Sequence, residues 1–316
     1  NFFGLGIKKQ IGETEYGIGA FPLGGYVKVS GIIDESMDTD TTGADHEYLS
    51  KTPLQQIWFS SAGVIMNLLL SFFLFSMIFF FQGVAEPDES ARIGNLIEGY
   101  PADQIGLKNN DLILSVNNQS VTDWQEMTDE IKNSSDMKLF LEWERDGKIF
   151  SDSISIRLEK TLVDGEYQDK RIIGISPLYL EAKNIGLIKS INLGFKRTID
   201  WLVLTAQSLF ILAKGDASLE EVGGPVLIAK LAGDSAKNGG IWALLGVMAI
   251  ISINLAFINI LPIPGLDGGH ALISIIEGLA GRKLPSKIKV SIQSFGMLIL
   301  FSLIILVIFN DIMRLL

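Results

Sequence analysis

The chain contains no cysteine, which excludes disulfide bonds and metal sites built on thiolates. Basic residues are also scarce, because 26 lysines and arginines stand against 36 acidic residues, for a formal net charge of -10. This acidic excess argues against nucleic acid as a partner. An initiator methionine and a signal-peptide pattern are absent too, since the sequence begins Asn-Phe-Phe-Gly. We therefore expect the chain to be a piece of a longer gene product.

Charged residues are missing from three stretches that are each long enough for a helix to cross a bilayer. They lie between Lys51 and Glu86, over 238–266 and over 290–310. A fourth apolar run, 201–213, is short and flanked by basic residues, so we expect it to lie along the interface or to pack on the core. The chain is 48% hydrophobic and 20% charged, with a mean hydropathy of +0.34, which is too polar for membrane helices alone. The sequence predicts a polytopic α-helical membrane protein with three spans and a water-exposed module.

Lysines and arginines close to the spans predict the orientation. Lys51 precedes the first span, and four more basic residues fall in the short connection between the second and third spans: Arg282, Lys283, Lys287 and Lys289. Short loops rich in these residues stay in the cytoplasm. The long segment between the first and second spans is then extracytoplasmic.

Residues 1–31 are rich in glycine and in β-forming residues. Glycine at this density opposes a helix, while Tyr26-Val27-Lys28-Val29 favours a strand. We expect a strand, a turn and a second strand that lie against the membrane surface. Residues 34–47 are acidic and small, which predicts a solvated loop with His46 exposed to water.

Residues 91–158 contain several short β-forming segments and one helical segment, which indicates a small β-rich domain. The expected elements are strands at 93–97 and 151–158, a helix at 123–132 capped by Thr122 or Asp123, and a hairpin with an Asp146-Gly147 turn within 139–150.

Within this module, Pro101-Ala-Asp-Gln-Ile-Gly-Leu-Lys-Asn-Asn-Asp-Leu-Ile-Leu-Ser-Val-Asn117 resembles the signature of a PDZ domain. Asn110 stands where that family usually has glycine, and asparagine tolerates the left-handed conformation that such a turn needs. The resemblance implies a domain that binds an extended peptide by strand addition. A β-domain without a ligand is the alternative.

One carboxylate, Asp267, follows directly after the second uncharged stretch. A carboxylate in hydrocarbon is costly unless a cation, a metal or a water-filled cavity compensates it. Pro262 and Pro264 prevent a continuous helix there, and non-helical backbone at membrane depth is tolerated only where protein encloses it. The segment therefore predicts an active or transport site. The alternative is that Asp267 serves only as the N-cap of a following helix.

Three landmarks together resemble the site-2 protease family of intramembrane zinc metalloproteases, in particular its bacterial branch that includes the regulator-of-sigma-E protease. Pro22-Leu-Gly-Gly-Tyr-Val-Lys28 is similar to the membrane-associated β-loop of the family, and the PDZ-like segment falls between spans. Asn259, Pro262, Pro264 and Leu266-Asp267-Gly268 match the family pattern Asn-x-x-Pro-x-Pro-x-Leu-Asp-Gly. Two further stretches are similar to family segments: Gly224-Pro225, and Ala62-Gly63 with Asn67.

The resemblance and the composition together divide the chain into seven parts. They are a membrane-associated β-loop with the acidic loop (1–53), a first span (54–85), an extracytoplasmic PDZ-like domain (86–180), a linker with an interfacial helix (181–236), a second span that ends in the motif (237–267), a cytoplasmic loop (268–289) and a third span (290–312).

The zinc motif of the family, His-Glu-x-x-His on a membrane helix, is missing. The chain has two histidines, His46 and His270, and neither belongs to such a motif. We expect that the motif lies on a helix upstream of this chain and that the chain alone is inactive. A family member that has lost its zinc site is the alternative.

The resemblance implies hydrolysis of peptide bonds in the transmembrane segments of single-pass substrates in the bacterial inner membrane, such as anti-sigma factors or signal-peptide remnants. Asp267 and the two missing histidines would hold Zn²⁺, and the missing glutamate would be the general base. The substrate would be bound by residues of the motif and of the β-loop: Asn259, Pro262, Pro264, Gly24, Gly25, Tyr26 and Val27.

Other readings of these features stay open at this point. Asn259 could instead satisfy backbone groups that the prolines free, and His270 is expected to pack or to support a ligand rather than to bind metal. The PDZ-like domain would take a peptide or a substrate ectodomain as partner, and the lipid bilayer surrounds the spans. Two other function classes remain: an inactive membrane scaffold with a PDZ domain, and a transporter, which should repeat the broken span.

Overall fold

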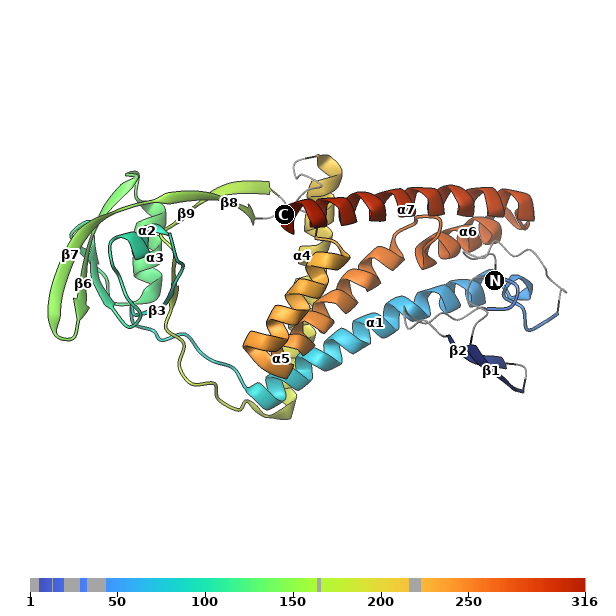
Figure 1. The fold of residues 1–316 in the computed structure, drawn as a ribbon, viewed down its shortest axis with the longest axis horizontal. Helices are drawn as coiled ribbons and strands as arrows, with labels where there is room; N and C mark the ends of the chain where they lie inside the picture. The colour runs from blue at the N-terminus through green and yellow to red at the C-terminus, as the bar shows by residue number, and fades with distance from the viewer. Residues whose placement is uncertain are drawn as a thin grey trace.

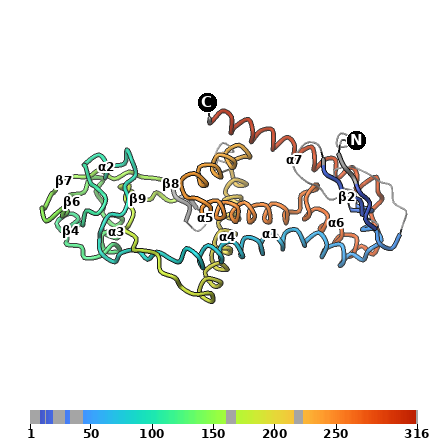
Figure 2. Tube along the Cα trace, turned by 60° about the horizontal axis from the view of Figure 1, so that its bottom comes forward, coloured from blue at the N-terminus to red at the C-terminus, as the bar shows by residue number. Residues whose placement is uncertain are grey.

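The computed structural model describes residues 6–12, 14–19, 29–32, 44–163, 166–215 and 223–315, and a β-rich domain and a group of long helices follow one another along its long axis (Figure 1). Among the described residues, α1 (Pro53–Gln82), α5 (Pro225–Ile260) and α7 (Ser286–Leu315) are long and apolar enough to cross a membrane. They coincide with the three uncharged stretches. The β-rich domain lies at one end of these helices, and the N-terminal hairpin and α6 (Asp267–Ala280) lie at the other (Figure 1, Figure 2).

Helix α1 begins with a complete capping box. The Thr52 side chain accepts a hydrogen bond from Gln55 N, and the Gln55 side chain accepts one from Thr52 N. Pro53 takes the first helical position, where its missing N–H costs nothing. Thirty residues give a rod of about 45 Å, longer than the ~30 Å of hydrocarbon in a bilayer.

Helix α4 (Gly186–Lys214) is longer than the expected run 201–213 and packs on α1. A Cβ at Gly194 would lie within 2.1 Å of Ser76 Oγ, so glycine permits the close crossing. Trp201 and Leu202 then pack against the buried Leu74 and other apolar side chains of α1 and α5. The helix therefore packs on the core, which was one of the two expected placements.

Helix α5 begins well before its uncharged stretch, at Pro225. Its first turn is capped from α7, since the Asp311 carboxylate accepts hydrogen bonds from the backbone N–H groups of Gly224, Val226 and Leu227 at 2.9, 3.0 and 3.1 Å. Gly240, with a φ of 64°, divides the helix at a kink. Gly224 and Pro225, which are similar to a family segment, thus lie where hydrogen bonds join the start of α5 to α7.

The segment 268–289, expected as a cytoplasmic loop between the second and third spans, contains a helix in its first half. Helix α6 occupies Asp267–Ala280 and ends at Gly281, whose left-handed φ of 63° is typical of a helix C-terminus. The basic residues that predicted orientation cluster after this helix. One of them, Lys289, forms a buried ion pair with Glu277 of α6 at 2.7 Å.

The β-rich domain has a four-stranded antiparallel sheet with the order β5-β4-β6-β7. Its core includes Ile93, Met127, Leu141 and Ile154, all nearly inaccessible to solvent. The other strands pair as β10-β3 and β8-β9. The elements are β3 (Ile93–Leu96), α2 (Pro101–Gln104), β4 (Leu112–Val116), β5 (Gln119–Ser120), α3 (Trp124–Asn133), β6 (Lys138–Arg145), β7 (Lys148–Ser155), β8 (Arg157–Val163), β9 (Glu166–Ile172) and β10 (Ile175–Pro177).

Three local predictions in this domain are confirmed. The Asp123 side chain caps α3 by accepting a hydrogen bond from Glu126 N at 2.8 Å. Asp146 and Gly147 both have positive φ in the turn between β6 and β7. Asn110 adopts the left-handed conformation, with a φ of 75°. The run 151–158, however, is divided between β7 and β8 at Ile156.

The N-terminal segment forms an antiparallel hairpin of β1 (Gly6–Ile11) and β2 (Thr14–Gly19). The expected β-loop residues Gly24, Gly25, Tyr26 and Val27 lie outside the described residues. His46 is exposed as predicted. Glu47 is not solvated, however, because it is only 3% exposed, and it precedes the buried Tyr48 of a short 3-10 turn (Tyr48–Ser50). The last residues of the acidic loop therefore pack against the helices.

The left-handed turn at Asn110 gives a stability prediction. Asn110→Gly should leave the stability unchanged or raise it, whereas Asn110→Val should lower the free energy of unfolding by about 1–3 kcal/mol, because a β-branched residue is strained at positive φ. Urea unfolding of the purified protein, followed by tryptophan fluorescence, measures both. Asn109→Val is the matched control, and an equal loss in the two valine variants would contradict the strain argument.

Candidate functional site

The helical structure of α5 stops at Ile260 and resumes at Asp267 in α6. Leu261 is extended, with φ -62° and ψ 140°, and Pro262 and Pro264 have no N–H to continue the helix. A turn closes the break, in which Leu266 N donates to Ile263 O at 3.1 Å and Gly265 has a φ of 100°. The predicted interruption of the helix is confirmed.

Three glycines allow this break to pack tightly. A Cβ at Gly268 would lie 2.3 Å from Leu261 O, and one at Gly269 would lie 2.4 Å from Ile263 O. Gly296 of α7 is the tightest of the three, because a Cβ there would lie 1.9 Å from Pro264 O. Backbone oxygens cannot yield to a side chain, so the three glycines bring α6 and α7 directly onto the broken segment.

Asp267 is the first residue of α6, and the N-cap position is occupied by Leu266. Asp267 is therefore not the N-cap that the alternative required. Its Oδ2 approaches α1 so closely that a Cβ at Gly63 would lie 3.2 Å from it. Gly63, singled out by its family likeness, is thus the point of α1 that faces the carboxylate.

The Asp267 carboxylate borders an open cavity of ≈ 300 Å³ between α1 and α6. Most of the lining is apolar, and Ser60, Ser61 and Pro262 are also on the wall. The described residues contain no group of three or more His, Cys, Asp or Glu that could hold a metal ion. A half-buried carboxylate beside such a cavity suits one oxygen ligand of a zinc site whose other donors come from elsewhere.

The predicted site residues are only partly brought together. Pro262 and Asp267 line the same cavity, while Asn259 lies half-buried in the last turn of α5 and is not on its wall. Pro264 packs its carbonyl on α7 instead. Asn67, from the same family match as Gly63, accepts a hydrogen bond through its backbone oxygen from Ser252 at 2.9 Å and ties α1 to α5.

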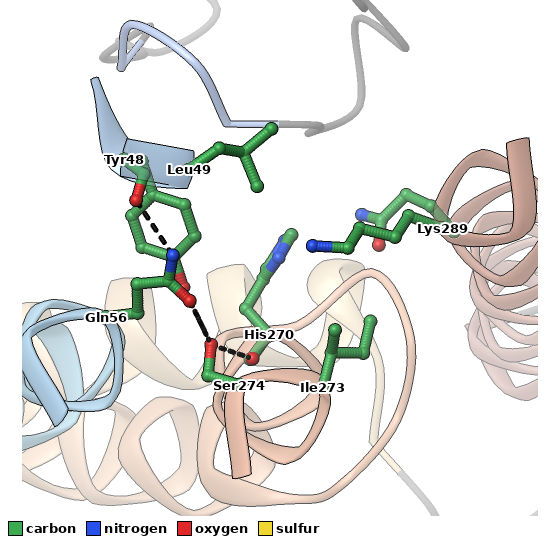
Figure 3. Close-up of a pocket in the computed structure, with 8 residues that line it drawn as sticks. Tyr48, Leu49, Gln56, His270, Ile273, Ser274 and Lys289 are labelled. Atoms are coloured by element: carbon green, nitrogen blue, oxygen red, sulfur yellow. Dashed lines mark hydrogen bonds between the residues drawn. The ribbon is translucent and has the colours of Figure 1, made fainter. Parts of the chain in front are cut away.

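A buried polar cluster lies beside this site, on the neighbouring face of α6 (Figure 3). Gln56 donates from Nε2 to Tyr48 O at 2.9 Å, and its Oε1 accepts from Ser274 Oγ at 2.9 Å. The Tyr48 ring meets His270 edge-on at 6.4 Å, and these residues with Lys289 surround a cavity of ≈ 20 Å³. His270 is thus a packing residue of this cluster, beside the helix turn that starts at Asp267.

Sequence reasoning missed this cluster. The available signal was the recurrence of polar or small residues at Gln56, Ser60 and Gly63, three or four positions apart on an otherwise apolar helix. Such a stripe indicates a face that packs on protein rather than on lipid. The spacing alone does not identify α6 as the partner.

Comparison with known proteins gives the family. Residues 1–303 match the model of peptidase family M50. A protein of Clostridium acetobutylicum named as a candidate zinc metalloprotease is 32% identical over 311 residues, which cover 98% of this chain and 85% of that protein. The zinc metalloprotease RasP of Oceanobacillus iheyensis is 30% identical over 284 residues, 90% of this chain and 65% of RasP.

These matches define the class of the protein as a membrane metalloprotease. The chain belongs to peptidase family M50, and the predicted membership of the site-2 protease family is confirmed. Among solved structures, the PDZ domain of an SdrC-like protein from Listeria monocytogenes is similar, with 19% identity and a TM-score of 0.23, over 30% of this chain and 94% of that domain.

The contact between Gly296 and Pro264 can be tested by a single methyl group. Gly296→Ala should destabilise the protein by about 1–3 kcal/mol, because α7 must move away from the broken segment. Gly246→Ala is the control, since the nearest atom to its Cβ would be 4.0 Å away. Thermal unfolding in detergent compares the two variants. If both melt at the same temperature, α7 does not depend on this contact.

Proposed function

We propose that this protein is an intramembrane zinc protease that hydrolyses peptide bonds in the transmembrane segments of single-pass proteins. The observation that carries the proposal is the Asp267 carboxylate, held at a break between apolar helices and facing an open cavity. An ionised carboxylate in apolar surroundings needs compensation, and a divalent cation provides it. Membership of peptidase family M50 supplies the reaction class.

Zinc would be held by Asp267 together with two histidines, and a glutamate would serve as general base, all three on a helix outside these 316 residues. When bound, the metal acts as a Lewis acid and lowers the pKa of a bound water. The residues of this chain provide the surroundings. Pro262 leaves an extended segment without a competing N–H, and Val64 belongs to the largely apolar wall of the cavity. Asn259, in the last turn of α5 and off the cavity wall, would offer its amide to the backbone of the substrate.

The substrates we propose are anti-sigma factors or signal-peptide remnants of a bacterial inner membrane. A helical amide is shielded from attack, so the substrate must unwind, and the β-loop residues Gly24, Gly25, Tyr26 and Val27 would receive it as an added strand. The PDZ-like domain would meet a peptide end or an ectodomain on the extracytoplasmic side. Its strand β3 is already paired with β10 along one edge, so a peptide would have to use another part of this domain.

The proposed orientation places the PDZ-like domain outside and the α6–α7 connection in the cytoplasm. The support is the basic residues of that connection and its position at the opposite end of the helices from the domain (Figure 1). Reporter fusions at Asn118 and Arg282 should report opposite compartments, and a fusion at Gly147 should agree with Asn118. The same compartment at Asn118 and Arg282 would refute the orientation.

The zinc role of Asp267 is tested in the protein that includes the His-Glu-x-x-His helix. Asp267→Asn keeps the shape but removes the charge, so zinc content should fall and cleavage should drop by more than the about 10- to 100-fold typical of outer ligand partners. Asp267→Glu should be nearly as damaging, because zinc–oxygen bonds of about 2.0–2.2 Å tolerate little displacement.

Asp234→Asn, an exposed acid in the first part of α5, is the matched control and should retain zinc and activity. Metal analysis and cleavage of a model transmembrane substrate are the measurements. Stoichiometric zinc with normal cleavage in Asp267→Asn would exclude Asp267 from the site. A wild-type protein that binds no zinc would favour the scaffold function instead.

A further inference from the structure

Helices α1 and α6 run antiparallel, and three contacts define their register. At one end Gly63 faces the Asp267 carboxylate, and at the other a Cβ at Gly278 would lie 3.2 Å from Pro53 Cβ. Between them, Gln56 Oε1 accepts from Ser274 Oγ at 2.9 Å. The first two contacts are steric, and the side-chain hydrogen bond of Gln56 is a direct polar link between the two helices.

Gln56 is placed to fix this register from three sides. It is only 3% exposed, and its Nε2 donates to the carbonyl oxygens of Tyr48 at 2.9 Å and Lys51 at 3.3 Å. With Oε1 bonded to Ser274, both ends of the amide are used. A single amide therefore joins α1, the segment that precedes it and α6.

Ser274 explains why loss of this link would displace α6 without unfolding it. Its hydroxyl lies 2.9 Å from Gln56 Oε1 and 3.0 Å from His270 O, and the Tyr48 hydroxyl is farther away at 3.5 Å. One proton serves one acceptor at a time, so without Gln56 the hydroxyl turns to His270 O within its own helix. Helix α6 then remains satisfied, but its direct hydrogen bond to α1 is gone. The contact that remains runs through the Tyr48 hydroxyl, which is 3.5 Å from Ser274 Oγ and 3.2 Å from Ser60 Oγ.

We infer that Gln56 is a positioning residue for Asp267, acting through Ser274 on the register of α6 against α1. Ser274 lies two helical turns from Asp267, about 10 Å along α6, so a shift at Ser274 is transmitted along a rigid rod to the carboxylate. A metal ligand displaced by a fraction of an ångström loses its bond. This inference rests on the proposed zinc role of Asp267.

The first experiment uses the full protein with its zinc motif and compares variants of similar shape. Gln56→Met and Ser274→Ala should each lower kcat and zinc affinity by about 10- to 100-fold with little change in KM. The double variant should be no more than about twofold worse than the worse single one, because both break the same link. Gln82→Met and Ser302→Ala, exposed positions on α1 and α7, are the controls and should behave as wild type.

A second experiment measures the register itself without activity. The chain has no cysteine, so spin labels can be placed at Phe73→Cys on α1 and Leu279→Cys on α6, positions that are 61% and 86% exposed and about 30 Å apart along the helices. Electron–electron double resonance should give a narrow distance distribution in wild type and Gln82→Met, and a broader or shifted one in Gln56→Met.

The outcomes distinguish the positioning role of Gln56 from the proposed protease function. If Gln56→Met matches Gln82→Met in distance, zinc affinity and kcat, or if the losses of the two single variants multiply in the double variant, the positioning role is refuted. If wild type binds no zinc and cleaves nothing, the proposed function fails, and the distance distribution alone decides whether Gln56 sets the register.

Discussion

The structure depends on one constraint: a chain that crosses apolar surroundings is interrupted, and the interruption must be enclosed by protein. Pro262 and Pro264 end α5, and the backbone groups they free cannot be left facing lipid. Gly268, Gly269 and Gly296 meet this requirement by letting α6 and α7 close over the gap with direct backbone contact. The two helices are therefore arranged around the break, and Asp267 stands where the chain resumes its helical form.

Helix α1 is the common packing partner of α4, α5 and α6. It meets α4 where Gly194 lies on Ser76, it meets α5 through Asn67 and Ser252, and it meets α6 through Gln56 and Gly63. Each contact uses a small or polar residue, as expected where helices pack without a hydrophobic gain between them. The faces that remain apolar, including Phe73 and Leu69, are exposed and suit contact with lipid.

Features that depend on local backbone chemistry could be predicted from the sequence. The break at the two prolines, the Asp146-Gly147 hairpin and the turn at Asn110 all follow from which residues adopt or refuse a given φ. Features that depend on distant contacts could not. An amide such as Gln56 or a hydroxyl such as Ser274 is common on helix surfaces, and its sequence neighbours do not reveal which distant helix it meets. The length of α6 could not be predicted for a related reason, because the basic residues after it mark the connection between two spans and not the end of a helix.

The surroundings of Lys289, which is paired with Glu277 in the folded protein, differ between membrane insertion and the final structure. When a chain is inserted during synthesis, each lysine beside a hydrophobic segment is still solvated and helps to decide which side of the bilayer it stays on. Once α6 and α7 have packed, this lysine is only 8% exposed and its charge is neutralised by a partner. A charge count on the finished surface would therefore miss a lysine that supports the proposed topology. In the proposed orientation, the same residue would first help to set the topology and later join α6 to α7.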